Sequence, residues 1–171
     1  MDKRLIAAGI ILIIVLVYVA LYAYSLSKVE VRNVQVDSLR DVTPSGFTLS
    51  GAVEVYNGGI VPVRIDAITY NVTLSKNSQH LTTGTIAGAK IGPKQTAQYR
   101  FNNTINWVPS AAFAYEIITG GDTDAIMQGT VSINSLMEVP FERRIDLGEY
   151  LKQFMGNSLG AAVDTIKGWF S

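Results

Sequence analysis

Beyond residue 28 the chain alternates apolar and polar residues with a period of two, and turn-forming residues interrupt the alternation at short intervals. This spacing is typical of an all-β sandwich or barrel. The predicted strands are Val29 to Val36, Phe47 to Val55, Val63 to Leu74, Leu81 to Ile86, a fifth strand in which Ala97, Tyr99 and Phe101 share a face, Ile126 to Ile133, and Met137 to Ile145. The alternation changes face between Asp66 and Ile68, which indicates a β-bulge. We predict a seven-stranded antiparallel β-sandwich over residues 28–146.

The N-terminal segment is apolar without interruption. Leu5 to Tyr24 is a run of 20 residues with no charge, and a helix of that length covers roughly 30 Å, the thickness of a bilayer core. Tyrosines 18, 22 and 24 gather at one end of the run, where their rings suit the headgroup layer. We predict that residues 1–27 form a transmembrane anchor and that the membrane is a partner of this chain.

Two alternatives to the anchor remain open. One is a cleaved signal peptide, because Ala23-Tyr24-Ser25 resembles a small-x-small cleavage site. The other is a buried core helix. Basic residues flank the apolar segment on both sides, so they do not fix its orientation. The Asn-x-Thr sequons at Asn71 and Asn102 are candidate N-glycosylation sites, and they favour a single-pass cell-membrane protein with an extracytoplasmic domain.

Two segments depart from the period of two. Pro109 and the spacing of Phe113 and Ile117 predict one short helix that ends at Gly120-Gly121. From residue 147 to 171 the apolar residues return to helical spacing, although four glycines weaken the pattern. We predict an amphipathic helical tail that begins at Leu147, at the membrane-distal end of the sandwich, and packs on the sandwich or on a neighbouring subunit. A helix lying in the membrane interface is the alternative.

Composition and charge narrow the function further. The 14 basic and 14 acidic residues balance, so the chain lacks the basic surplus that non-specific nucleic-acid binding requires. The absence of cysteine excludes disulfides, thiol catalysis and thiolate metal sites.

Reactive groups are few. His80, the single histidine, stands in a polar turn, where solvent exposure is the expected state. Asp122 and Asp124 resemble a fragment of a calcium loop, but the loop lacks the spacing and the terminal Glu of an EF-hand. No serine lies in a nucleophile elbow, and no Gly-rich stretch matches a phosphate cradle. We predict no catalytic, cofactor-binding or metal-binding residue, no cofactor and no enzymatic activity.

The segment YNGGIVPVRIDAITYNV, with Asn57 at the end of one strand and Val61-Pro62-Val63 at the entry to the next, carries the most specific pattern. It resembles the late-embryogenesis-abundant type 2 family, also called the water-stress and hypersensitive-response domain, over roughly Val29 to Ile145. Asn57, Pro62 and Tyr70 match the family motif, whereas Gly58 and Gly59 stand where the family has Pro-Asn. Because Asn and Gly both tolerate a positive φ, we interpret this segment as a structural turn.

The resemblance implies a fibronectin-III-like sandwich and a non-enzymatic role in desiccation or stress tolerance. Our first hypothesis is a membrane-tethered binding or protective domain on the outside of a prokaryotic, archaeal cell. The alternative is a structural subunit of a membrane complex or surface assembly, which contacts other proteins or a second copy through the sandwich or the tail. Fold alone does not decide between these hypotheses.

Overall fold

The computed structural model describes residues 3–43, 46–106, 121–150 and 168. One long helix precedes a set of antiparallel strands. The elements are α1 (Lys3–Leu26), β1 (Val29–Thr43), β2 (Gly46–Asn57), β3 (Val63–Leu74), β4 (His80–Ala87), β5 (Lys90–Ile91), β6 (Gln95–Asn106), β7 (Asp124–Ile133) and β8 (Met137–Asp146).

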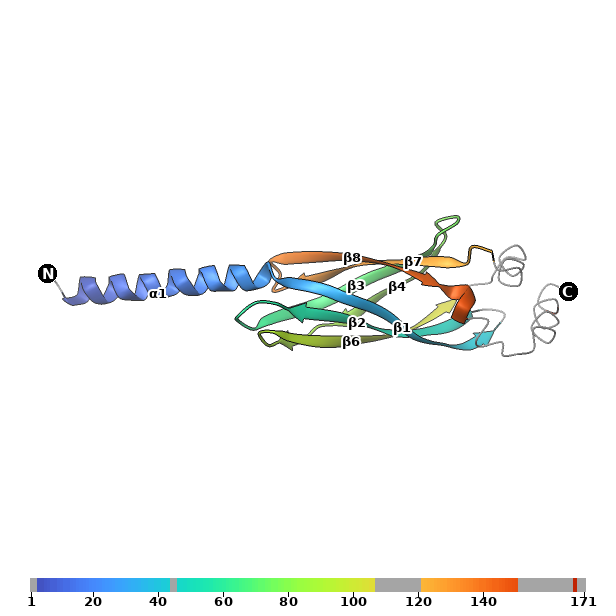
Figure 1. The fold of residues 1–171 in the computed structure, drawn as a ribbon, viewed down its shortest axis with the longest axis horizontal. Helices are drawn as coiled ribbons and strands as arrows, with labels where there is room; N and C mark the ends of the chain where they lie inside the picture. The colour runs from blue at the N-terminus through green and yellow to red at the C-terminus, as the bar shows by residue number, and fades with distance from the viewer. Residues whose placement is uncertain (1–2, 44–45, 107–120, 151–167, 169–171) are drawn as a thin grey trace.

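The strands form two antiparallel sheets that pack face to face. The first sheet has the order β1-β2-β6, and the second has the order β4-β3-β7-β8 with β5 paired to β3. Figure 1 shows the two sheets as layers of one elongated body, with α1 projecting from one end. The predicted β-sandwich character is confirmed. The predicted number of seven strands is wrong, because the described residues form eight.

One continuous apolar core lies between the sheets, built from the inward-facing side chains of both. Val53, Val55, Ile68 and Val131 are fully buried, as expected where branched side chains fill the space between two pleated surfaces. The alternation that predicts these strands therefore reports which residues face the opposite sheet.

The extra strand and the longest strand both escape the sequence pattern for local reasons. β5 contains two residues, too few to show alternation, and it pairs with Val63 and Arg64 of β3. β1 continues to Thr43, well beyond the predicted end at Val36. The sequence pattern misses this extension because three register shifts against β2 interrupt the period of two. The shift between Ile65 and Ala67 in the β3–β7 pairing confirms the predicted bulge.

The tight turn between β7 and β8 has the expected conformation. Asn134 and Ser135 both adopt positive φ, at 50° and 53°, which is the pairing that a two-residue hairpin turn requires. On β8 the residues predicted to share a face do so, because Ile145 is buried while Met137, Val139 and Phe141 pack against the core.

A helical turn begins at Leu147, where the tail is predicted to begin, at the end of the sandwich opposite α1 (Figure 1). The backbone N–H of Glu149 donates to Oδ1 of Asp146 at 3.1 Å, which caps this turn. Leu147 is fully buried, and the hydroxyl of Tyr150 donates to the carbonyl of Val36 at 3.1 Å. The rest of the predicted tail, apart from residue 168, and the predicted helix after Pro109 lie outside the described residues.

Candidate functional site at the junction of helix and sandwich

Helix α1 is apolar along its exposed length. The window Gly9–Leu26 has a mean hydropathy of 2.5 and is long and apolar enough to cross a membrane. Most of its large side chains are half exposed or more. A core helix would be covered on at least one face, so the alternative of a buried core helix is wrong.

Asn57 organises the turn between β2 and β3. Its side chain is fully buried, and Nδ2 donates to the carbonyls of Val61 at 2.9 Å, Gly92 at 3.1 Å and Ile91 at 3.3 Å. Its Oδ1 accepts the backbone N–H of Gly59 at 2.9 Å. One amide thus joins the β2–β3 turn to the segment around β5, in the position predicted for the structural motif.

Ser25 joins the same turn to the helix. Its side chain is fully buried, and its Oγ accepts the backbone N–H groups of Ile60 at 3.0 Å and Val61 at 3.1 Å. Both donors belong to a turn with no strand partner at these positions, and an unpaired buried N–H costs about 1 to 3 kcal/mol. The last turn of α1 therefore completes the hydrogen bonding of the sandwich.

The two glycines of this turn serve close packing, and the expected positive φ is wrong. Neither Gly58 nor Gly59 is in the left-handed region. A Cβ on Gly59 would lie 2.5 Å from Cα of Ser25, and a Cβ on Gly58 would lie 2.9 Å from the carbonyl oxygen of Lys28. Gly59 is therefore required by the approach of the helix.

The connection from helix to sandwich is short and bonded throughout. Ser27 and Lys28 separate α1 from β1, and their backbone N–H groups donate to Ala23 and Ser25 at 3.1 and 3.2 Å. The N–H of Gly58 donates to the carbonyl of Lys28 at 2.9 Å. The β2–β3 turn thus contacts both the last turn of α1, through Ser25, and the connecting residue Lys28.

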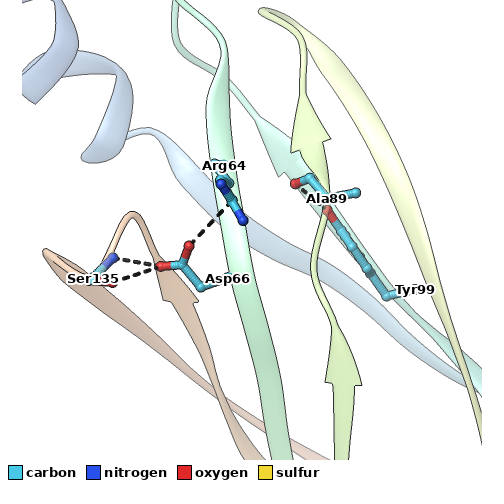
Figure 2. Close-up of polar contacts among 5 residues, drawn as sticks. All are labelled: Arg64, Asp66, Ala89, Tyr99 and Ser135. Carbon is cyan, nitrogen blue, oxygen red and sulfur yellow. Dashed lines mark hydrogen bonds and ion pairs between the residues drawn. The ribbon is translucent and has the colours of Figure 1, made fainter.

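Two tyrosines stabilise the sandwich near this end and in its centre. Tyr99 donates its hydroxyl to the carbonyl of Ala89 at 3.1 Å, as Figure 2 shows. Tyr70, the last residue of the predicted motif, lies between the sheets with its ring 5.4 Å from that of Phe101. Burial raises the pKa of Tyr70 to about 12, against a smaller opposing effect of its hydrogen bond with Asn103. Burial likewise raises the pKa of Tyr99, with the bond to Ala89 opposing it.

Pro62 is exposed and immediately precedes β3, where its missing N–H takes nothing from the sheet. The two sequons lie on strands. Asn71 is half-buried on central β3, and Asn102 is exposed on β6, where its Oδ1 accepts the hydroxyl of Ser50 at 3.2 Å.

The candidate reactive residues lie apart from one another. His80 is exposed at the start of β4, with Nε2 2.8 Å from Oγ1 of Thr83. Asp122 accepts the N–H of Asp124, whose own carboxylate lies 3.4 Å from Nε of Arg144. Within residues 3–43, 46–106 and 121–150, no group of three His, Asp or Glu side chains could hold a metal.

A shallow groove of about 730 Å³ crosses the outer face of the second sheet, over β3, β7 and β8. Gly129 lies on β7 with its Cα facing the core, where the missing Cβ leaves room for the ring of Phe141. Nε2 of Gln128 donates to Oε2 of Glu142 at 2.9 Å along the floor of the groove. The remaining lining residues are Thr69, Tyr70, Asn71, Thr83, Thr130 and Pro140.

The role of Ser25 was not predicted from sequence. In the sequence Ser25 is notable only as part of a cleavage-like triplet, and its hydrogen-bond partners lie 35 and 36 residues away. The Gly58-Gly59 pair is the one local sign in the sequence that the helix approaches this turn closely. It can be interpreted in this way only once the backbone angles show that neither glycine has a positive φ.

No family model matches the chain, and no curated protein matches it. Among solved structures, a protein from Archaeoglobus fulgidus is 16% identical, with 68% of this chain and 94% of that one covered at a TM-score of 0.48. The sporulation control protein Spo0M from Bacillus subtilis is 18% identical over 70% of this chain and 49% of its own, at a TM-score of 0.44. A protein from Arabidopsis thaliana is 16% identical over 69% and 83%, at a TM-score of 0.42. At these values the likenesses carry no functional argument.

Proposed function

We propose that this chain is a single-pass membrane protein whose β-sandwich is seated on a retained helical anchor and acts outside the cell as a non-enzymatic binding or protective module. The observation that carries the proposal is the pair of hydrogen bonds from Ile60 and Val61 to the buried hydroxyl of Ser25. A signal peptide cleaved after Ser25 would take this acceptor away and expose Gly59 and the buried edge of the turn. The fold therefore uses the segment that cleavage would remove.

The seated anchor favours a role at the membrane surface. A flexible linker would let the domain sample a large volume, whereas two connecting residues and a bonded turn hold this sandwich next to the bilayer. Such a geometry suits a module that protects the membrane or molecules at its surface. Together with the resemblance to the late-embryogenesis-abundant type 2 family, it supports a role in desiccation or stress tolerance on an archaeal or other prokaryotic cell.

We further propose that the sandwich is a fibronectin-III-like variant. The sheet orders β1-β2-β6 and β4-β3-β7-β8 support this assignment, with the two-residue β5 as an additional strand at the edge of the second sheet.

The protective role is tested with vesicles that carry the full chain and enclose a self-quenched dye. After drying and rehydration, we expect these vesicles to retain more dye than vesicles carrying a peptide of residues 1–27 at the same density. Equal retention in the two samples would contradict a protective role of the sandwich and leave the anchor itself untouched.

A structural subunit is the second candidate. The groove on the outer face of the second sheet favours it, because the groove presents Pro140 next to polar side chains such as Gln128 and Glu142. Native mass measurement of the detergent-extracted chain distinguishes the two candidates. A partner of fixed stoichiometry would favour the subunit, and a lone chain would favour the protective module.

A further inference from the structure

The end of the sandwich around α1 presents apolar side chains to its surroundings. Outside α1, the large hydrophobic residues that are exposed in the described part of the chain are Ile60 at 48% and Leu136 at 73%. Ile60 lies in the β2–β3 turn and Leu136 in the β7–β8 turn, and both turns lie at the end of the sandwich where α1 enters (Figure 1). Among the described residues outside α1, the exposed large apolar side chains therefore lie at the face that a membrane containing α1 would meet.

The connecting segments at this end carry only basic charges. The segments that connect elements here are 27–28, 58–62, 88–94 and 134–136, and their charged residues are Lys28, Lys90 and Lys94. Arg64, the second residue of β3, adds a guanidinium that is 76% exposed. Carboxylates also lie near this end, on Glu30 of β1, Asp66 of β3 and Glu138 of β8. The basic charge is therefore confined to the connecting segments and Arg64. A basic surface next to a bilayer attracts anionic lipid headgroups.

A cavity of about 510 Å³ opens on the same end, lined by Pro62, Val63, Arg64, Gly88, Ala89, Lys90 and Asn134. Its walls are fixed to β3 by backbone hydrogen bonds. On one side Ile65 donates to the carbonyl of Ala89 at 3.0 Å, and on the other Asn134 donates its backbone N–H to the carbonyl of Arg64 at 3.0 Å. Tyr99 holds Ala89 from below through its hydroxyl.

One residue that lines the cavity, Asn134, carries a side-chain donor without a partner. Nδ2 of Asn134 is buried and has no hydrogen-bond acceptor among the residues that the structure describes. A buried donor without a partner costs about 1 to 3 kcal/mol, and a rotation of the Asn134 side chain toward an acceptor in the cavity would remove that cost. Arg64 and Lys90 line the same space, which makes an anionic oxygen the fitting acceptor.

One carboxylate lies next to this site. Oδ2 of Asp66 accepts the backbone N–H of Ser135 at 2.6 Å and its hydroxyl at 3.3 Å, and Oδ1 lies 3.7 Å from Nε of Arg64 (Figure 2). Asp66 is thus engaged with the β7–β8 turn, and its contact with Arg64 exceeds hydrogen-bond length. The guanidinium keeps donors to offer a ligand.

We propose that this end of the sandwich is a docking surface for anionic phospholipid, in which Arg64, Lys90 and Asn134 bind the headgroup phosphate while Ile60 and Leu136 enter the bilayer interface. The proposal rests on the proposed function, because it requires α1 to lie in the membrane. It specifies what the seated sandwich does there: it holds lipid of the membrane that anchors it.

Depth measurements on the full chain in lipid nanodiscs test the apolar tips. Because the chain has no cysteine, single fluorescent labels can be attached to L136C, I60C, V15C in α1, and Q79C in the turn at the opposite end. We expect lipid-borne quenchers to quench the labels at 15, 60 and 136 and to leave the label at 79 unaffected. Quenching at 15 without quenching at 60 and 136 would overturn the docking surface, whereas no quenching at 15 would overturn the anchor itself.

Charge variants test the phosphate site. In nanodiscs of increasing phosphatidylglycerol content, R64Q and K90Q should each require about fivefold more anionic lipid for half-maximal quenching at 136, the loss expected for one basic residue at an anionic surface. R100Q, which removes an exposed arginine from the middle of β6, is the matched control and should behave as the parent chain. An equal response of all three variants would contradict the site.

The side-chain amide of Asn134 reports the occupant directly. Its nitrogen resonance should shift when phosphatidylglycerol replaces phosphatidylcholine, and inorganic phosphate added to phosphatidylcholine nanodiscs should not reproduce the shift at millimolar concentration. The same shift with inorganic phosphate alone would mean a free-anion site and would overturn the assignment to lipid.

Discussion

Single polar atoms decide how the helix and the sandwich meet. Asn57 bonds to four backbone groups and Ser25 to two, and both side chains are fully buried. Where the turn packs against the end of the helix, its backbone groups lose their hydrogen bonds to water. A polar side chain of suitable length then supplies the missing hydrogen-bond partner. The identities of these two residues therefore follow from the backbone that they serve.

Replacing Ser25 by Ala should lower the free energy of unfolding of the sandwich by about 1 to 3 kcal/mol, because the N–H groups of Ile60 and Val61 lose their acceptor. Ser27→Ala is the matched control, since the hydroxyl of Ser27 is exposed and donates to the carbonyl of Tyr24 at 2.8 Å. Thermal unfolding of both variants in detergent provides the comparison. Equal midpoints for the two variants would show that α1 is not seated on the turn.

The buried tyrosines predict a loss of stability at alkaline pH. The pKa of Tyr70 is about 12 in the fold and that of Tyr99 is also raised, whereas an unfolded tyrosine has a pKa of about 10. The neutral phenol is favoured in the fold, so stability is complete below about pH 10 and declines as pH rises toward 12, by at most about 1.4 kcal/mol per pH unit for each group. Tyr70→Phe should reduce this slope in denaturant unfolding followed between pH 9 and 12. An unchanged slope would contradict the assignment.

At the level of elements, α1 behaves as part of the sandwich. Its last turn packs against Gly59, and Leu26 contacts the core that begins at Val29. The β2–β3 turn is shaped to receive it. The contact between α1 and this turn therefore fixes the position of the sandwich relative to the helix.

Adding one carbon at this contact should separate the helix from the turn. Gly59→Ala places a Cβ against the backbone of Ser25, so we expect a loss of about 1 to 3 kcal/mol from overpacking. Gly58→Ala meets the carbonyl of Lys28 less closely and should cost less. Denaturant unfolding ranks the two variants. The opposite order would favour the positive-φ interpretation of Gly58 over close packing.

The strands that the sequence predicts best are those with an unbroken alternation. β3 and the start of β8 match their predicted positions. Along these strands apolar side chains that face the opposite sheet alternate with polar side chains that face solvent, so the sequence pattern follows the structure. The sequence predicts β1 seven residues too short, because its register shifts reverse the alternation of apolar and polar residues. β5 has too few residues to show any alternation. The contact of Ser25 with the turn depends on three-dimensional approach, and no local period encodes it.

The described part of the molecule is an elongated sandwich with α1 projecting from one end (Figure 1). Two of its edge strands, β1 and β8, have features that oppose the addition of further strands. β1 is interrupted by bulges, and β8 carries Pro140 among charged residues, which are features that natural edge strands use against aggregation. These two edges are therefore poor sites for the addition of a further strand.

Membrane insertion should depend on the apolar length of α1. Ile14→Arg places a charge near the middle of the helix and should disfavour insertion by about 2.5 to 3.5 kcal/mol. Carbonate extraction of membranes that contain the parent or the variant measures this, with Lys76→Arg in the distal turn as a control that keeps its charge. Full retention of the variant in the membrane fraction would contradict a spanning helix.

The central claim is that α1 remains attached and holds the sandwich at the membrane. Intact-mass measurement of the chain extracted from its native membrane tests this claim most directly. The account predicts the mass of the chain that extends to Ser171 and includes all of Lys3–Leu26, recovered from the membrane fraction. A chain that begins at Leu26 and is recovered in soluble form would show that the helix is a cleaved signal peptide and would contradict the account.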